Sequence, residues 1–269
     1  MSKAFVDTTV FTDAIIKGPP YNKAARDSLK RYTETHLPTY AIKEFKAGPL
    51  SHHAWLHNKF ATLKSFHKTL NALHGMAMSP RKYRTATALE ALRDAAKATG
   101  TVSSKTLIAK YGARAGEDSV LSDKYRLAIR YRIFRAWKIR RTTTSRVVLP
   151  IPCYKEIAPY EERGLIEITP TKCDVTECSL ASALKNNPKD LEKLKDSIGS
   201  PTNQEQQRRY QALRQLIRKP KEAMTEKMCR ALGDAVFVFF APDDSVILTT
   251  NTKDHEPLAR ALGKTVETP

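Results

Sequence analysis

Three acidic residues near the two ends of the chain have the type and placement needed to bind a divalent metal ion. Asp7 ends a short apolar stretch, Glu44 follows Tyr40-Ala-Ile-Lys, and Asp234 opens the apolar segment 233–240. An acid at the carboxyl end of a central strand lies where open α/β sheets place their sites, and converging carboxylates hold hard divalent cations. We therefore predict Asp7, Glu44 and Asp234 as metal ligands, in a site of the kind that hydrolyses phosphodiester bonds.

The N-terminal motifs resemble those of the PIN-domain nucleases. That family opens with a hydrophobic strand ending in Asp-Thr/Ser-Asn/Ser, which residues 7–9 match as Asp-Thr-Thr. It also carries a glutamate in its second or third helix, about as far along the chain as Glu44.

The C-terminal motifs follow in the family's order. An Asp-Ala pair with two apolar residues is matched at 234–237, a strand ending in Thr-x-Asp at 247–251, and an acid before the last helix at Asp254. The resemblance covers residues 3–50 and 222–267, which is less than half of the chain.

The resemblance implies an α/β fold, a PIN-like parallel sheet flanked by helices. It implies that Asp7, Glu44 and Asp234 hold one or two Mg²⁺ or Mn²⁺ ions, with Asn251 and Asp254 completing the catalytic set. Hydroxyls such as that of Thr9 would then steady a carboxylate or the scissile phosphate.

The sequence departs from the family at two positions. Asn251 stands where the family usually has an acid, and an amide gives a metal less charge than a carboxylate. Either Asp254 takes over this role or the site binds its metal more weakly. The segment 236–240 is β-branched and aromatic, which by propensity favours a buried strand, whereas the resemblance implies a helix. We expect the helix.

Composition indicates a polyanionic partner. The formal net charge is +18 and the pI is about 9.8, which favours nucleic acid ahead of a membrane. The four cysteines lack zinc-site spacing, as expected for a reduced chain. No apolar segment approaches the ~20 residues that a membrane span needs. We expect a cytoplasmic protein without a membrane partner.

Hydrophobic periodicity predicts a nuclease core, residues 1–49 and 222–269, divided by a large, basic, mostly helical insertion at 50–221. We expect a helix at 22–36 and a second helix, capped by Thr39, that carries Glu44. One long helix should have an apolar stripe from Leu56 to Ala77, and the next should start at Ser79-Pro80 and run to about Lys97. Further helices are expected at 122–141, 188–198 and 204–218. Short strands are expected at 146–152 and 165–168.

The insertion carries the charge, with 34 lysines and arginines but 15 aspartates and glutamates between Lys46 and Lys221. Its helix 122–141 is the predicted nucleic-acid-binding surface, because arginine-rich faces contact phosphates. The predicted contacts, together with Thr9, are Arg126, Arg130, Arg132, Arg135, Lys138, Arg140 and Arg141. The alternative is a solvated helix whose aromatic residues pack in the core. His53 and His57 have the spacing of a metal pair but lack a third ligand, so we interpret them as a polar flank.

We hypothesise that the chain is a metal-dependent PIN-like endonuclease whose insertion binds the substrate. RNA is favoured over DNA because most of the family cuts RNA. Many small PIN proteins are toxins held by an antitoxin; this chain is about twice their length, so a defence effector within a larger protein complex is an equal alternative. The rival hypothesis is a non-catalytic nucleic-acid-binding protein on a degenerate PIN fold, in which Asn251 marks a decayed site.

Overall fold

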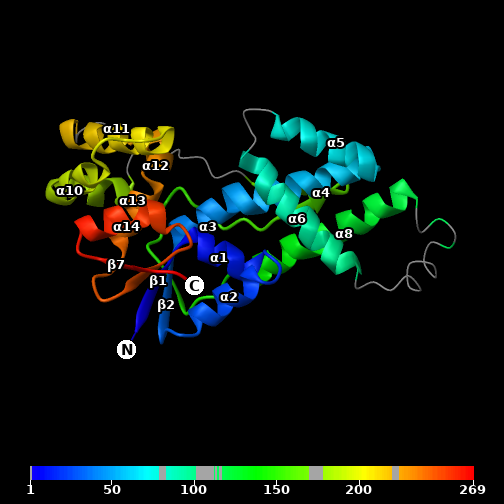
Figure 1. The fold of residues 1–269 in the computed structure, drawn as a ribbon, viewed down its shortest axis with the longest axis horizontal. Helices are drawn as coiled ribbons and strands as arrows, with labels where there is room; N and C mark the ends of the chain where they lie inside the picture. Colours follow the sequence, from blue (N-terminus) through cyan, green and yellow to red (C-terminus); the bar gives the residue numbers. More distant parts are fainter. Residues whose placement is uncertain are drawn as a thin grey trace.

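A five-stranded parallel sheet lies toward one end of the elongated molecule (Figure 1). The computed structural model describes residues 2–78, 83–100, 112, 114, 117–169, 178–219 and 224–269. The strand order is β3-β2-β1-β6-β7, and every neighbouring pair is parallel. The bounds are β1 (Lys3–Val6), β2 (Glu34–Pro38), β3 (Arg146–Val148), β6 (Val246–Leu248) and β7 (Thr265–Glu267).

Strand β1 is the buried centre of this sheet. Ala4, Phe5 and Val6 are at most 1% exposed, so both faces of the strand are covered, as its uninterrupted apolar sequence requires. The chain builds outward from β1 to β2 and β3 on one side and to β6 and β7 on the other. The order in which the chain adds strands therefore reverses between β1 and β6, and ligands of open α/β sheets bind beyond the carboxyl ends of the strands at such a point.

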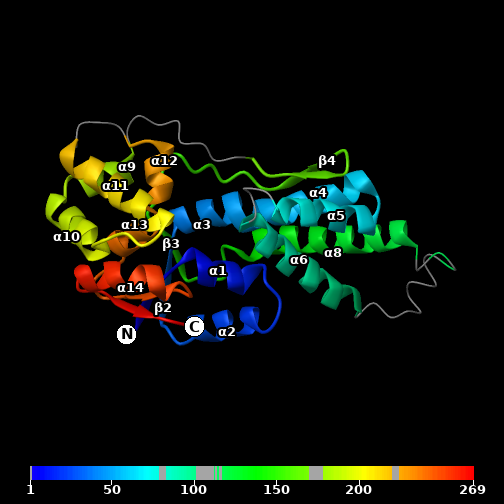
Figure 2. The same cartoon turned by 45° about the horizontal axis from the view of Figure 1, so that its top comes forward.

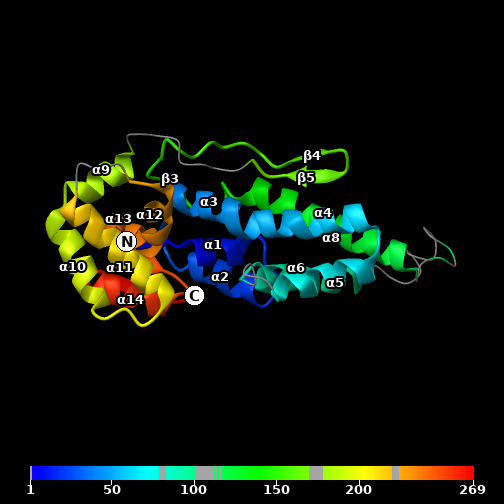
Figure 3. The ribbon, with the colours of Figure 1, turned by 90° about the horizontal axis from the view of Figure 1, so that it is seen from above.

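Helices surround the sheet and extend from it. Those nearest the sheet are α1 (Thr8–Ile15), α2 (Tyr21–Leu29), α3 (Thr39–Phe45), α13 (Gly233–Phe240) and α14 (Thr252–Ala261). An elongated arm contains α4 (Ser51–Leu63), α5 (Phe66–Ala77), α6 (Tyr83–Gly100) and α8 (Asp118–Ile139) (Figure 3). The hairpin β4 (Tyr160–Glu162) and β5 (Leu165–Glu167) runs along α4, where the Asn58 amide bonds both N and O of Ile166 at 2.7 and 2.9 Å.

A second helical group lies beside α13 and α14 (Figure 2). It comprises α9 (Ser179–Lys185), α10 (Pro188–Ile198), α11 (Gln204–Arg218) and α12 (Glu226–Ala231). None of the helices in the described ranges combines the length and apolar character needed to cross a bilayer.

The expected insertion is not separate from the core. Strand β3 lies within residues 50–221, yet it pairs with β2 in the central sheet. The α3 helix also continues through a π-helical turn, Lys46–Leu50, into α4 of the arm. Residues 50–221 therefore supply the edge strand β3, the arm, and helices α9, α10 and α11 of the second helical group.

Two expected helices are wrong in extent. The helix predicted for 22–36 ends at Leu29, and Glu34–Pro38 forms β2, because its alternating buried side chains pair in register with β1. The long helix predicted across Leu56 to Ala77 is broken at Lys64, which has a φ of 49°, and Ser65 then caps α5 through the Lys68 N–H.

The predicted cap at Thr39 is also wrong. Pro38 occupies the cap position, and the Thr39 hydroxyl donates to the carbonyl of Val148 at 3.2 Å. Its role is to join α3 to the residue at the end of β3.

Other predictions are confirmed. Helices α10 and α11 match 188–198 and 204–218, and α8 matches 122–141 to within a turn at its start. The α13 segment is a helix despite its strand propensity, since Phe237 packs edge-on against Phe5 of β1 at 5.9 Å. The helix ending near Lys97 is confirmed as α6, whereas its expected start at Ser79-Pro80 lies outside the described residues.

Candidate active site

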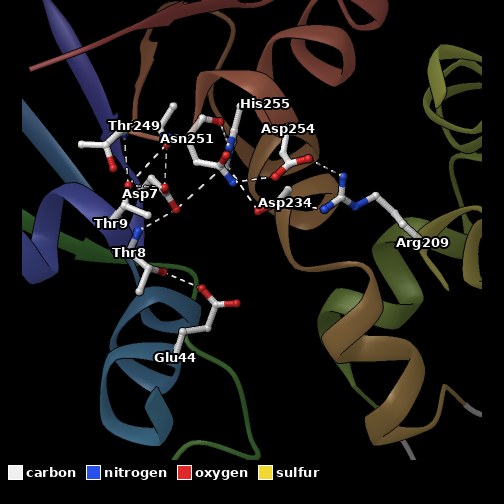
Figure 4. A network of polar contacts seen from close by, with 11 residues as sticks. Asp7, Thr8, Thr9, Glu44, Arg209, Asp234, Thr249, Asn251, Asp254 and His255 are labelled. Atoms are coloured by element: carbon white, nitrogen blue, oxygen red, sulfur yellow. Dashed lines mark hydrogen bonds and ion pairs between the residues drawn. The ribbon is translucent and has the colours of Figure 1, made fainter. Parts of the chain in front are cut away.

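Asp7 is held at the carboxyl end of β1, where it caps α1. Its Oδ1 accepts from the Thr8 N–H at 2.7 Å, and its Oδ2 accepts from the hydroxyls of Thr9 and Thr249, each at 2.7 Å (Figure 4). The carboxylate is 3% exposed. Three donors from the ends of β1 and β6 therefore fix its orientation.

Glu44 approaches from α3 and shares a neighbour with Asp7. Its Oε2 accepts from the Thr8 hydroxyl at 2.5 Å. Burial raises the pKa of Glu44 to about 8, and the charges of Asp7 and Asp234 add to this increase. Gly233 makes room for the carboxyl group, since a Cβ there would lie 3.2 Å from Oε1.

Asp234 lies in the first turn of α13 and faces the same region (Figure 4). Its Oδ2 forms an ion pair with Nη2 of Arg209, and its Oδ1 lies 3.9 Å from Nε2 of His255. Burial raises the pKa of Asp234, while the charges of Arg209 and His255 act in the opposite direction. The structure thus brings together all three predicted metal ligands.

His255, on α14, lies between two of these acids. Its Nδ1 is 3.0 Å from the carbonyl oxygen of Asn251, so Nδ1 must carry a proton to donate this bond. Nε2 lies 4.0 Å from Oδ1 of Asp7 and has no hydrogen-bond partner, although the side chain is buried. With Nδ1 carrying the proton, the Nε2 lone pair faces two carboxylates, an arrangement that a metal cation between them would stabilise.

Asn251 and Asp254 form the outer edge of the site. The Asn251 amide donates to Oδ2 of Asp254 at 3.0 Å, and Asn251 N–H donates to the Thr249 hydroxyl at 2.9 Å. Oδ1 of Asp254 lies 4.0 Å from Nη1 of Arg209. Both predicted residues therefore adjoin the acids, with Asn251 acting as a donor toward Asp254.

Sequence reasoning missed Arg209 and His255. Arg209 comes from α11, inside the segment assigned to the insertion, and its side chain is almost fully buried in the site (Figure 4). Several arginines occupy α11, so no spacing distinguishes this one. His255 follows Asp254 directly, and its position one helical turn beyond Asn251 was an available signal.

The predicted phosphate-binding residues of α8 differ in their availability. Arg132 donates to the carbonyl of Ile16 at 3.1 Å and pairs with Asp94, while Arg140 stacks over Trp137 at 3.7 Å. These two side chains are largely buried. Arg126 pairs with Asp123, Arg130 with Glu161, and Arg140 and Arg141 with Glu156.

Arg135 and Lys138 are exposed on α8. Of the predicted contacts, Thr9 is the one that lies in the acidic site, where it binds Asp7.

The two histidines of α4 do not form a polar flank, contrary to expectation. His53 and His57 are at most 3% exposed. Nδ1 of His53 bonds the Pro49 carbonyl at 2.9 Å, and burial lowers the pKa of His53 to about 4. They are core residues of the arm because α4 is covered by α8 and the β4–β5 hairpin.

Comparison of the chain with protein-family models, with curated proteins and with solved structures finds no match. Among the residues that the structure describes, no group of three or more His, Cys, Asp or Glu is already arranged to hold a metal ion.

Proposed function

We propose that this chain is a metal-dependent PIN-like endonuclease. The observation that carries the proposal is the convergence of Asp7, Glu44 and Asp234 from three separate elements at the carboxyl ends of β1 and β6. Buried acids that repel one another are costly unless a cation compensates them, and such costs concentrate at functional sites.

The donor set suits Mg²⁺ or Mn²⁺. Carboxylate oxygens of Asp7, Glu44 and Asp234 are hard ligands, and the unpartnered Nε2 of His255 points between two of them. Bound by these residues, the ion would supply Lewis acidity toward the phosphodiester and activate water for in-line attack. The hydroxyls of three threonines, Thr8, Thr9 and Thr249, donate to the carboxylates of Asp7 and Glu44 and orient them.

Glu44 has a further role in this proposal. With its pKa raised to about 8 by burial, Glu44 holds a proton at neutral pH in the metal-free protein. Metal binding requires the carboxylate form, so binding would release that proton and become tighter as pH rises toward 8.

Nucleic acid is the proposed substrate, with RNA ahead of DNA. The net charge of +18 supports a polyanionic ligand, and the exposed Arg135 and Lys138 of α8 offer phosphate contacts on the arm. A role as a toxin or defence effector, controlled by an antitoxin or within a larger protein complex, is part of the same proposal and rests on the family resemblance. The cytoplasm is the compartment we propose.

The second candidate is a non-catalytic nucleic-acid-binding protein. Two observations favour it: Arg209 forms an ion pair with Asp234, and the amide of Asn251 donates to Asp254. A decayed metal site would have these features.

Cleavage of labelled single-stranded RNA and DNA in Mg²⁺, Mn²⁺ or chelator distinguishes the two candidates. The nuclease cuts in metal and stops in chelator, and Asp234→Asn removes cutting while binding persists. A protein that binds equally well in chelator and cuts in neither metal is the non-catalytic binder.

A further inference from the structure

Arg209 brings a positive charge into the acidic site from a different part of the chain. Its side chain is 4% exposed, and its Nη2 forms an ion pair with Oδ2 of Asp234. Its Nη1 lies 4.0 Å from Oδ1 of Asp254. The guanidinium thus faces the two acids contributed by α13 and α14 (Figure 4).

The acids on the other side of the site have no such partner. Asp7 and Glu44 are bonded by threonine hydroxyls and the Thr8 N–H, which orient the carboxylates without cancelling their charge. The unpartnered Nε2 of His255 lies at 4.0 Å from Oδ1 of Asp7 and 3.9 Å from Oδ1 of Asp234, between the two sides. The site is therefore electrically asymmetric.

The position of Arg209 then limits where divalent ions can bind in the site. The guanidinium lies against Asp234 and Asp254, whereas no cationic side chain pairs with Asp7 or Glu44 among the contacts described above. A second divalent ion placed beside Asp234 and Asp254 would lie against the guanidinium, and this repulsion grows as water is excluded from the site.

We propose that Arg209 is a built-in cation of the active site, which takes the place of a second metal ion, so that the chain binds one divalent ion. The inference rests on the proposed metal-dependent function and specifies it. Arg209 acts as a positioning residue: it pairs with Oδ2 of Asp234 and faces Asp254, so that Oδ1 of Asp234 is left to hold the ion together with Asp7, Glu44 and His255.

The test counts bound Mn²⁺ by isothermal titration calorimetry and by the electron paramagnetic resonance signal of free Mn²⁺. Wild type is compared with Arg209→Gln and Arg209→Met, which remove the charge, and with Arg209→Lys, which keeps it. Arg208→Gln is the matched control, because Arg208 is the neighbouring arginine of α11 and is exposed.

We expect one ion in wild type, Arg209→Lys and Arg208→Gln. Arg209→Gln and Arg209→Met should bind a second ion and hold the first about tenfold more tightly or better, since one charge at this range alters ionisation equilibria by about one to three powers of ten.

Two ions in wild type would overturn the inference, and this measurement needs no variant to fold. The same number and affinity in wild type, Arg209→Gln and Arg209→Met would also overturn it, while metal-dependent cleavage would leave the proposed function standing. No Mn²⁺ bound by wild type or by any folded variant would remove both the inference and the proposed function.

Discussion

The hydroxyl of Thr249 donates a 2.7 Å hydrogen bond to Oδ2 of Asp7, joining two residues that are 242 positions apart. Asp7 follows β1 and Thr249 follows β6, so this bond connects the carboxyl ends of two adjacent parallel strands. It makes the geometry of the acidic site depend on correct pairing of the two ends of the chain. Oδ1 of Asp7 is left facing His255.

Thr249→Val should weaken both the fold and the site. The substitution keeps the side-chain shape but removes a donor to Asp7 and an acceptor for the Asn251 N–H. We expect a loss of about 1–3 kcal/mol in the free energy of unfolding, as for a buried polar group left without its partner. Urea unfolding measures this loss, and Thr250→Val, at the exposed neighbouring threonine, should change it little. Equal stability of the two variants would contradict the role given to Thr249.

Asp7→Asn should abolish most cleavage and leave nucleic-acid affinity unchanged or raised. The substitution removes a metal ligand and one negative charge from the site. Cleavage rates and binding isotherms are measured on the same substrate, with Asp27→Asn, an exposed acid of α2, as the control. Full activity in Asp7→Asn would exclude the metal-site proposal.

Glu44 should make the metal-free protein less stable as pH rises from about 4.5 to 8. The folded state keeps its proton up to a pKa of about 8, because of burial, whereas the unfolded chain loses it near 4.5. The unfolded state therefore binds fewer protons in this window, so the free energy of unfolding falls with rising pH.

Glu44→Gln should remove this loss. Above pH 8, the free energy of unfolding of Glu44→Gln should exceed that of wild type by about 1–3 kcal/mol, after allowance for partial solvent screening. Below pH 4.5 the two proteins should be equally stable. Urea unfolding in chelator across this range measures the difference. Glu256→Gln, at an exposed glutamate, is the control. If the difference in unfolding free energy between wild type and Glu44→Gln does not change with pH, Glu44 is not the titrating group.

The arm should bind phosphates through the exposed part of α8. Changing Arg135 and Lys138 together to Ala should weaken binding of all sequences alike and reduce the salt slope by about two, one per lost phosphate contact. Changing Lys189 and Lys193, which are exposed on α10, together to Ala removes the same charge and is the control. Arg132→Ala should instead lower stability, because Arg132 bonds Ile16 and Asp94 internally. If both double variants lower the slope equally, net charge rather than α8 governs binding.

Much of the fold was predictable where a segment's own pattern determined it. The apolar run of β1 and the amphipathic periods of α10 and α11 gave the observed elements. The errors arose where distant contacts decided the outcome. Residues 34–38 form a strand because β1 and β3 lie on either side of it, and the break at Lys64 lets Phe66 stack against Phe60 at 6.1 Å.

The acidic residues of the site could be predicted from the sequence, because they lie at the ends of strands and helices or in motifs of the family that the chain resembles. Asp7, Glu44 and Asp234 come together as the motifs indicated. Arg209 was not predictable, because its burial depends on how α11 packs against α10 and α12, and nothing in the sequence of α11 separates it from the exposed Arg208.

Asn251 stands where the sequence departs from the family it resembles. Because Asn251 is an amide, the site has one carboxylate fewer than the family pattern. The amide donates to Oδ2 of the neighbouring acid, Asp254, at 3.0 Å, so this oxygen already accepts a hydrogen bond. Mn²⁺ binds nitrogen and oxygen sites more tightly than Mg²⁺ and tolerates less ideal geometry, so cleavage should be faster in Mn²⁺ at equal concentration.

Asn251→Asp should narrow that difference by restoring a carboxylate, and Asp254→Asn should widen it if Asp254 has taken over the missing acid's role. Cleavage rates of wild type and both variants, measured against each metal, decide this, with exposed Glu256→Gln on the same helix as the control. The same ratio of Mn²⁺ to Mg²⁺ rates in all the proteins would mean that neither Asn251 nor Asp254 influences the ion, and that the C-terminal motif matches the family in sequence alone.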